Sequence, residues 1–102
     1  MEQRATVLDA LGDPTRRSIL ELLQDGPRSV QEIADALPVT RSAVSQHLRV
    51  LKEAQLVRDR PLGTRRLYSL ATEGLEDARA YLDAFWRQAL AELKSAAEEK
   101  RS

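Results

Sequence analysis

The sequence predicts a mainly helical fold with one small β-hairpin, in a single domain over residues 1–102. Apolar residues recur at helical spacing through most of the chain, which predicts amphipathic helices. Two of these helical segments are short and meet at a tight turn, Pro38-Val39-Thr40. A glycine-containing turn also separates two short extended segments between residues 56 and 70, which indicates the hairpin.

The first two predicted helices lie on either side of Gly12. Residues 3–11 form a short amphipathic segment that Gly12 ends, and Asp13 is a fitting N-cap for the next helix. Pro14 occupies the first helical position, where its missing amide costs nothing. The apolar face of this second helix comprises Ile19, Leu20, Leu22 and Leu23. We interpret both helices as core-forming.

Residues 29–54 predict two short helices joined by a turn. Ser29 with Glu32 three residues later is the signature of a capping box, so the first helix begins there. Pro38 ends it, because proline lacks the amide that a helix needs and disfavours helical dihedrals at the preceding residue. Thr40 is a fitting N-cap for the second helix. The apolar stripe of that helix comprises Val44, Leu48 and Leu51.

The opposite face of the second short helix carries side chains that hydrogen-bond to base edges or phosphates. These candidate DNA-reading residues are Ser42, Ser45, Gln46 and Arg49. Gln46 suits adenine, and Arg49 suits guanine or a phosphate. A helix held by one apolar stripe, with polar and basic residues outside, is what reading of the major groove requires. An ordinary helical hairpin with a solvated polar face is the alternative.

The net charge of zero is unevenly distributed along the chain. Residues 1–40 carry four Lys and Arg against seven Asp and Glu, and residues 67–102 carry five against seven. Residues 41–66, by contrast, carry seven against two, a net charge of +5. Basic charge concentrated in and just after the reading helix is typical of phosphate binding, because each neutralised phosphate releases counterions.

The segment 56–70 predicts a β-hairpin whose turn is Pro61-Leu62-Gly63-Thr64. A basic hairpin directly after a helix-turn-helix is a wing, which can lie along the DNA backbone or enter the minor groove. The residues expected to make such contacts are Arg41, Arg58, Arg60, Arg65 and Arg66. A solvated charged hairpin remains a fair alternative for any single arginine. The predicted fold is therefore a winged helix-turn-helix.

The last predicted helix, over residues 73–98, has more apolar surface than a terminal helix needs to cover a core of this size. Such a surplus indicates a partner, and a second copy of the chain is the simplest one. The first helix can pack beside it. We therefore predict a homodimer through the first and last helices, at Val7, Leu8, Leu75, Tyr81, Leu82, Phe85, Trp86, Ala89, Leu90 and Leu93. Two reading helices about one DNA turn apart would require a palindromic operator.

The single histidine, His47, lies at the edge of the apolar stripe of the second short helix. It is a candidate for a phosphate contact or an interhelical hydrogen bond within the DNA-binding unit. A half-buried packing role is an equally good interpretation. A metal-ligand role lacks partner residues in the sequence.

Composition excludes several functional classes. There is no cysteine, one histidine and no glycine-rich phosphate loop, so no nucleophile–base pair can be named and the protein is not expected to be an enzyme or to use a cofactor. No apolar run reaches the roughly 18 residues of a membrane span. The N-terminal residues do not form a secretory signal, and a cytoplasmic location is expected.

Three stretches together resemble the arsenic-repressor (ArsR) family of winged helix-turn-helix repressors. They are Leu11–Leu20 with its "DPTRR", Ser42–Lys52 within "VSQHLRVLKEA", and Leu56-Val57. The resemblance covers residues 4–93 and is quite specific. It implies a homodimer that binds double-stranded operator DNA, usually to repress transcription, with the first and last helices at the dimer interface.

The chain departs from the metal-sensing members of that family. The resemblance implies cysteine ligands on the helix corresponding to Ser29–Leu37, or Asp, His and Glu ligands on the terminal helices, and this sequence has no cysteine there and no histidine in its last helix. We therefore predict no metal site and no metal sensor. A winged-helix protein-interaction module without DNA reading is the alternative function, against which the net charge of residues 41–66 argues.

Overall fold

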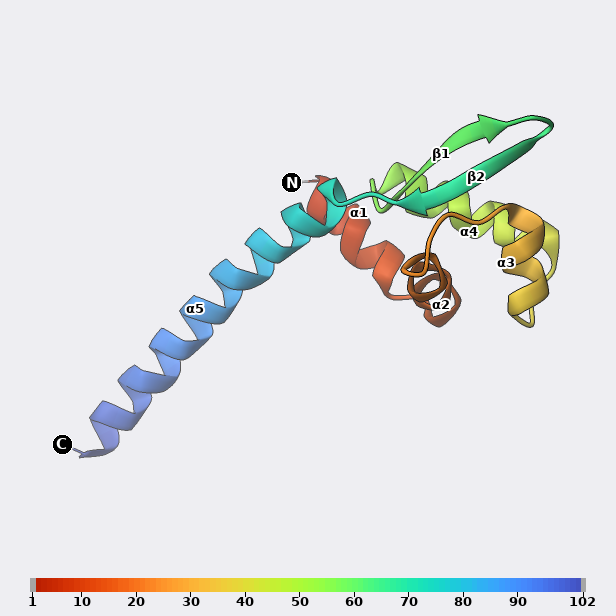
Figure 1. Cartoon of the computed structure of the whole chain (residues 1–102). Helices are drawn as coiled ribbons and strands as arrows, with labels where there is room; N and C mark the ends of the chain where they lie inside the picture. The colour runs from red at the N-terminus through yellow and green to blue at the C-terminus, as the bar shows by residue number, and fades with distance from the viewer. Residues whose placement is uncertain (1, 102) are drawn as a thin grey trace.

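The structure, a computed structural model, describes the backbone of residues 2–101 and the side chains of residues 6–100. Five helices and one two-stranded antiparallel sheet follow one another along this part of the chain (Figure 1). Their order is α1 (Glu2–Leu11), α2 (Pro14–Leu23), α3 (Val30–Ala36), α4 (Arg41–Glu53), β1 (Val57–Leu62), β2 (Arg65–Leu70) and α5 (Glu73–Arg101). The predicted mainly helical fold with one hairpin is confirmed. Met1 and Ser102, the ends of the predicted domain, lie outside the described residues.

Side chains at the start of α2 join it to the end of α1. The Asp13 carboxylate accepts hydrogen bonds from the amides of Thr15 and Arg16, which confirms Asp13 as the N-cap. Arg16 donates through Nε to the carbonyl oxygen of Ala10 at 2.8 Å, and Arg17 donates to that of Leu11 at 2.6 Å. The two arginines thereby satisfy carbonyl groups that the end of α1 leaves without helical partners.

Local capping residues set the ends of the two helices of the helix-turn-helix, α3 and α4. Ser29 and Glu32 form the complete capping box, with Ser29 N donating to Glu32 Oε1 at 2.8 Å. Leu37, which precedes Pro38, is extended (φ −128°, ψ 154°), so α3 ends where proline was predicted to end it. Thr40 caps α4 by accepting a hydrogen bond from the amide of Ala43.

The hairpin has a shorter turn than predicted. Leu62 pairs with Arg65, so only Gly63 and Thr64 lie between the strands, and Pro61 belongs to β1. Gly63 has a φ of +62°, and of the two turn residues it alone has a positive φ, as in a type II′ turn. Proline is tolerated here because β1 pairs with β2 alone among the described residues, which leaves its outer edge free.

The outer edge of β2 is paired with the segment before α3. The backbone of Arg28 exchanges two hydrogen bonds with that of Tyr68, at 3.0 Å and 2.8 Å. This bridge holds the base of the hairpin against the helix-turn-helix.

The core lies where α1, α2, α3 and α4 meet the base of the hairpin and the first turns of α5. Its largest fully buried side chains are Val7, Ile19, Ile33, Val44, Leu48, Leu51 and Leu56. Most of α5 takes no part in it, since no residue between Arg79 and Lys100 is buried. Figure 1 shows α5 leaving the rest of the molecule as a long arm. The radius of gyration is accordingly 18.1 Å, against about 13 Å for a compact domain of this length.

Within the part of the chain that the structure describes, no helix combines the length and the apolar character needed to cross a membrane.

Candidate nucleic-acid interface

The orientation of α4 separates its apolar stripe from its polar face. Val44, Leu48 and Leu51 are 0% exposed and pack in the core. The four predicted base-reading residues lie on the side of α4 that faces away from the core, and all four are exposed: Ser42, Ser45, Gln46 and Arg49. Arg41, at the first position of α4, is also exposed. The helix therefore offers a continuous polar and basic surface that a groove of DNA could receive.

The strand register divides the four arginines of the wing between the two faces of the sheet. Arg58 pairs with Ser69, Arg60 with Leu67, and Leu62 with Arg65, and residues that pair directly project from the same face. Arg58, Arg60 and Arg65 therefore share one face. Arg66 projects from the other face, with Asp59 and Tyr68, because side chains alternate along a strand.

Two of these arginines are engaged within the protein. Arg58 Nη2 lies 3.2 Å from Glu73 Oε1 at the start of α5, in an exposed ion pair that is worth little on its own. Arg66 Nε donates to Asp59 Oδ2 at 2.6 Å. Four other arginine side chains of this surface make no hydrogen bond or ion pair with any described residue: Arg41, Arg49, Arg60 and Arg65. These four have their full hydrogen-bonding capacity available for phosphates or bases.

Arg65 lies near the N-terminus of α3. Glu32 has a pKa below its ordinary value, chiefly because its carboxylate accepts the amide hydrogen bond of Ser29, and the positive charges of Arg65 and Arg28 lower it further. Arg65 of the wing is thus close enough to the start of α3 for its positive charge to act on Glu32. Arg28 was not among the predicted site residues. Its Nε atom is buried and has no hydrogen-bond partner among the described residues.

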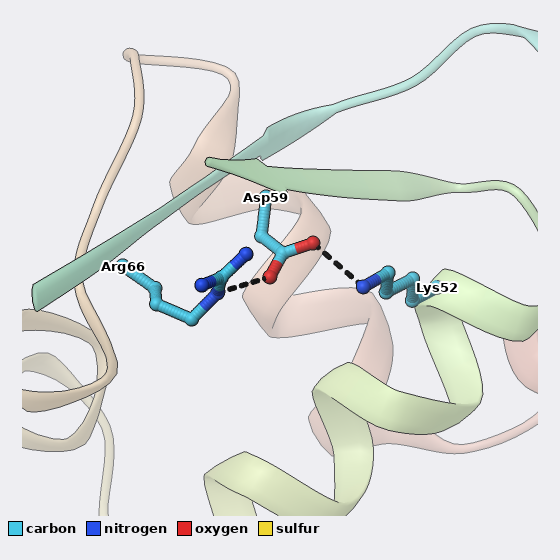
Figure 2. A network of polar contacts seen from close by, with 3 residues as sticks. All are labelled: Lys52, Asp59 and Arg66. Atoms are coloured by element: carbon cyan, nitrogen blue, oxygen red, sulfur yellow. Dashed lines mark hydrogen bonds and ion pairs between the residues drawn. The ribbon is translucent and has the colours of Figure 1, made fainter. Parts of the chain in front are cut away.

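A carboxylate joins the wing to α4. Asp59 of β1 accepts one bond from Lys52 Nζ at 2.8 Å and the other from Arg66 Nε at 2.6 Å, and its side chain is only 6% exposed. Figure 2 shows this carboxylate between the two cations, one from α4 and one from β2. The hydrogen bonds from Lys52 and then Arg66 hold the pKa of Asp59 below its ordinary value of 3.8, although burial opposes the shift.

Sequence reasoning assigned no role to Lys52 or Asp59. Residue spacing contained no signal for their contact, because Lys52 is on a helix and Asp59 on a strand, with a bend of the chain between them. The hairpin pattern could have placed Asp59 and Arg66 on the same face, but only once the register was known.

His47 is half-buried between α4 and α2. Its Nδ1 atom lies 3.5 Å from Arg16 Nη1, at the outer limit of a hydrogen bond. Arg16 also binds carbonyl oxygens of α1, so the contact links α1, α2 and α4. The positive charge of the Arg16 guanidinium beside the ring disfavours the binding of a metal ion at His47. Among the described residues, no group of three or more potential metal ligands occurs. The residues present do not fit the metal sites that the family resemblance implies.

The ten predicted dimer-interface residues differ in their exposure in the single chain. Val7 is 0% exposed in the single chain, where it packs in the core. Ala89 is half-buried. The other eight are large and exposed, among them Phe85 (63%), Trp86 (62%) and Leu93 (68%). They are Leu8, Leu75, Tyr81, Leu82, Phe85, Trp86, Leu90 and Leu93.

Comparison with known proteins places the chain among bacterial regulators. A family profile described as "Bacterial regulatory protein, arsR family" matches residues 13–59. The chain is 59% identical over 81 residues to the HTH-type transcriptional regulator Rv2034 of Mycobacterium tuberculosis, covering 79% of this chain and 76% of that protein. It is 39% identical over 72 residues to the transcriptional repressor SdpR of Bacillus subtilis, covering 71% and 80%.

A solved structure shares the fold. It is a solution NMR structure described as the homodimeric winged helix-turn-helix DNA-binding domain of a possible ArsR-family transcriptional regulator from Mycobacterium bovis. The TM-score is 0.67 at 33% identity, covering 91% of this chain and 83% of that one. Matches in sequence and in structure agree with the winged helix-turn-helix seen here, and they identify a regulator that is not an enzyme. The chain belongs to the ArsR family of winged helix-turn-helix, DNA-binding transcriptional regulators.

Proposed function

We propose that the protein is a homodimeric repressor that binds a palindromic operator and does so without a metal sensor. The observation that carries this proposal is that one chain presents two exposed surfaces of different character. The first is the exposed polar and basic face of α4 beside the wing, and the second is the exposed apolar face of the α5 arm. The first surface suits DNA, and the second suits another copy of the chain.

In this proposal, α4 reads bases in the major groove. Gln46 contacts adenine through its amide, Arg49 contacts guanine or a phosphate, and Ser42 and Ser45 contact either bases or phosphates. The exposure of these four side chains and the burial of the stripe behind them support the assignment. His47, whose ring faces Arg16, contributes a phosphate contact only from the edge of this surface.

The wing and the start of α4 hold the DNA backbone. Arg60 and Arg65 lie on the same face of the hairpin and, among the described residues, have no ion-pair partner, so they are the principal wing contacts, with Arg41 at the N-terminus of α4. Arg58 and Arg66 can still donate through their remaining N–H groups, although each already binds a carboxylate. Such contacts fix orientation and supply salt-dependent affinity without reading sequence.

The α5 arm is the dimerisation helix. Its apolar stripe runs through Leu75, Leu82 and Phe85 to Leu93 and is exposed in the single chain. A helix of 29 residues that projects from the core gains little stabilisation from its own chain. Pairing two such stripes, with α1 packed beside each, would bury them and relate two copies of α4 by a two-fold axis. The homodimeric relative of similar fold supports this assembly.

The proposal of repression rests on the similarity to a named repressor, and the proposal of metal independence rests on the chemistry of metal ligands. SdpR, a relative at 39% identity, is named as a transcriptional repressor. A zinc or soft-metal site needs thiolate or imidazole ligands, and the chain contains no cysteine and one histidine.

Selection of binding sites from random duplex DNA, using protein treated with a chelator, tests the proposal. We expect enrichment of a palindrome with half-sites about one helical turn apart. A parallel selection with divalent metal ions tests metal independence, and enrichment that appears only with metal would contradict it. No enrichment in either arm would contradict sequence-specific DNA binding.

A further inference from the structure

We propose that Asp59 is a positioning residue that fixes the wing at a set orientation to α4, so that the wing arginines and α4 bind one DNA duplex together. The inference rests on the DNA-binding roles of α4 and the wing proposed above. Asp59 itself touches no DNA in this proposal. It acts through Lys52 and Arg66, which it holds at 2.8 Å and 2.6 Å.

Asp59 and Tyr68 form a cross-strand pair, or rung, of the hairpin. Of the rungs that are bonded to the rest of the molecule, it is the one nearest the tip. On one side of this rung, the Tyr68 backbone is hydrogen-bonded to Arg28. On the other side, the Asp59 side chain is bonded to Lys52 of α4. Beyond the rung lie residues 60–67, of which all but the half-buried Leu67 are exposed, and no hydrogen bond joins them to any described residue outside the hairpin.

The tip of the wing is therefore supported at one end only. Along the inner face of β1, burial falls from Val57, which is 2% exposed, through the Asp59 side chain at 6%, to the exposed Pro61. Apolar packing thus ends at the base of the wing. Lys52–Asp59 is the polar contact closest to the tip that ties β1 to α4. Loss of this contact would free the hairpin to pivot, carrying Arg60 and Arg65 with it.

Electrostatics alone predicts the opposite result for removal of Asp59. The carboxylate is one of two acidic groups among nine charged residues in segment 41–66. Its removal would make this surface more positive and release two cations for phosphate contacts, which should strengthen binding and steepen its salt dependence. If Asp59 positions the wing, its removal should weaken binding instead. The two accounts therefore differ in the sign of the effect.

The experiment compares the dissociation constants of the wild-type protein, Asp59→Asn and Glu53→Gln for a fluorescent duplex enriched by selection with the wild-type protein. Glu53→Gln is the matched control, because the Glu53 side chain is exposed on α4 and makes no hydrogen bond or ion pair with the described residues. Both variants remove one negative charge from the same surface. We expect Asp59→Asn to bind about tenfold more weakly and Glu53→Gln to bind as tightly as the wild type or more tightly.

A double-mutant cycle with Arg65→Ala separates positioning from a general loss of folded protein. In the wild-type background Arg65→Ala should weaken binding, whereas in the Asp59→Asn background it should have much less effect, since Arg65 is no longer held against the duplex. If Asp59→Asn only reduced the fraction of folded protein, Arg65→Ala would weaken binding by the same factor in both backgrounds. An equal factor in the two backgrounds would therefore overturn the inference.

If Asp59→Asn does not fold, Asp59→Glu provides the same test, because it keeps the charge and moves the carboxylate by one methylene. Weaker binding at unchanged net charge supports the inference. Binding by Asp59→Asn, or by Asp59→Glu in its place, that equals or exceeds that of the wild type overturns it while leaving DNA binding intact. Failure of the wild-type protein and Glu53→Gln to bind any duplex would instead overturn the proposed function, and this inference with it.

Discussion

The amide nitrogen of Gly74 lies 2.9 Å from the carbonyl oxygen of Gln55, and this hydrogen bond joins the first turn of α5 to the end of α4. Gln55 adopts a positive φ of 60° at this point, and Gly74 is buried. A Cβ atom on Gly74 would lie 2.9 Å from the Gln55 carbonyl oxygen, and closer still to that of Ala54. The α5 arm therefore meets the end of α4 through a contact between backbones that leaves no room for a side chain.

Gly74→Ala should destabilise the protein, because backbone atoms cannot yield as the end of a side chain can. We expect a loss of about 1–3 kcal/mol in the free energy of unfolding, measured by denaturant titration. Gly12→Ala is the matched control: its added Cβ would lie 3.3 Å from the nearest atom, the Asp9 carbonyl oxygen, so its loss should be smaller. Equal stability of Gly74→Ala and the wild type would show that the junction is not tight.

Gln46→Ala should change the DNA sequence that the protein prefers. Loss of a bidentate contact to adenine would cost about 1–3 kcal/mol at the base pair it reads and relax selectivity there. Repeating the binding-site selection with the variant measures this directly. Gln24→Ala, which removes an exposed glutamine beyond the end of α2, should leave the selected site unchanged. An identical site for Gln46→Ala and the wild type would remove Gln46 from the base-reading residues.

Arg65→Ala should weaken binding to all duplexes by a similar factor. Each lost phosphate contact lowers the slope of log affinity against log salt by about one. Fluorescence anisotropy over a salt series, with selected and random duplexes, measures both quantities. The control, Arg79→Ala, removes an exposed arginine of α5 that is paired with Asp83. A slope that stays at the wild-type value in Arg65→Ala would exclude the phosphate contact.

Trp86→Glu should dissociate the dimer, because it places a charge in the centre of the apolar stripe of α5. Central aromatic residues of an interface commonly contribute 2 kcal/mol or more, so we expect the dimer dissociation constant to rise by roughly 30-fold or more. Leu82→Glu should act similarly. Sedimentation equilibrium gives the association state directly, with Arg87→Glu as a control at the adjacent exposed position. A Trp86→Glu protein that remains dimeric would contradict the proposed interface.

The contribution of Asp59 to stability should depend on pH in the acid range. The pKa of this carboxyl is lowered in the folded protein, chiefly by Lys52 and Arg66, so the unfolded chain takes up a proton at a higher pH than the folded one. The resulting stabilisation is fully present at neutral pH and is lost as the pH falls below the ordinary value of 3.8 and through the folded pKa. The difference in unfolding free energy between wild type and Asp59→Asn should therefore shrink from pH 7 toward pH 3. A constant difference would contradict this linkage.

The starts of α2, α3 and α4 and the exposure of the polar face of α4 could be predicted from sequence because local interactions determine them. Asp13, Ser29 with Glu32, and Thr40 each bind an amide two or three residues away, so their caps formed as predicted. The stripe of Val44, Leu48 and Leu51 follows from helical periodicity, and its burial leaves the polar residues of α4 outside. These features depend on no knowledge of how the elements pack.

Whether the side chain of each wing arginine is free or already bound to a carboxylate depends on the tertiary structure. Arg58 meets Glu73 fifteen positions away, and Arg66 meets Asp59 seven positions away, so neither contact follows from a helical or strand repeat. The burial of Val7 likewise depends on how α1 packs against the rest of the core. The sequence by itself determined where each element begins and which of its faces is polar, because these follow from forces between near neighbours. The tertiary structure alone decided which charges are already paired and which apolar residues stay exposed, because both depend on the surfaces that distant segments bring together.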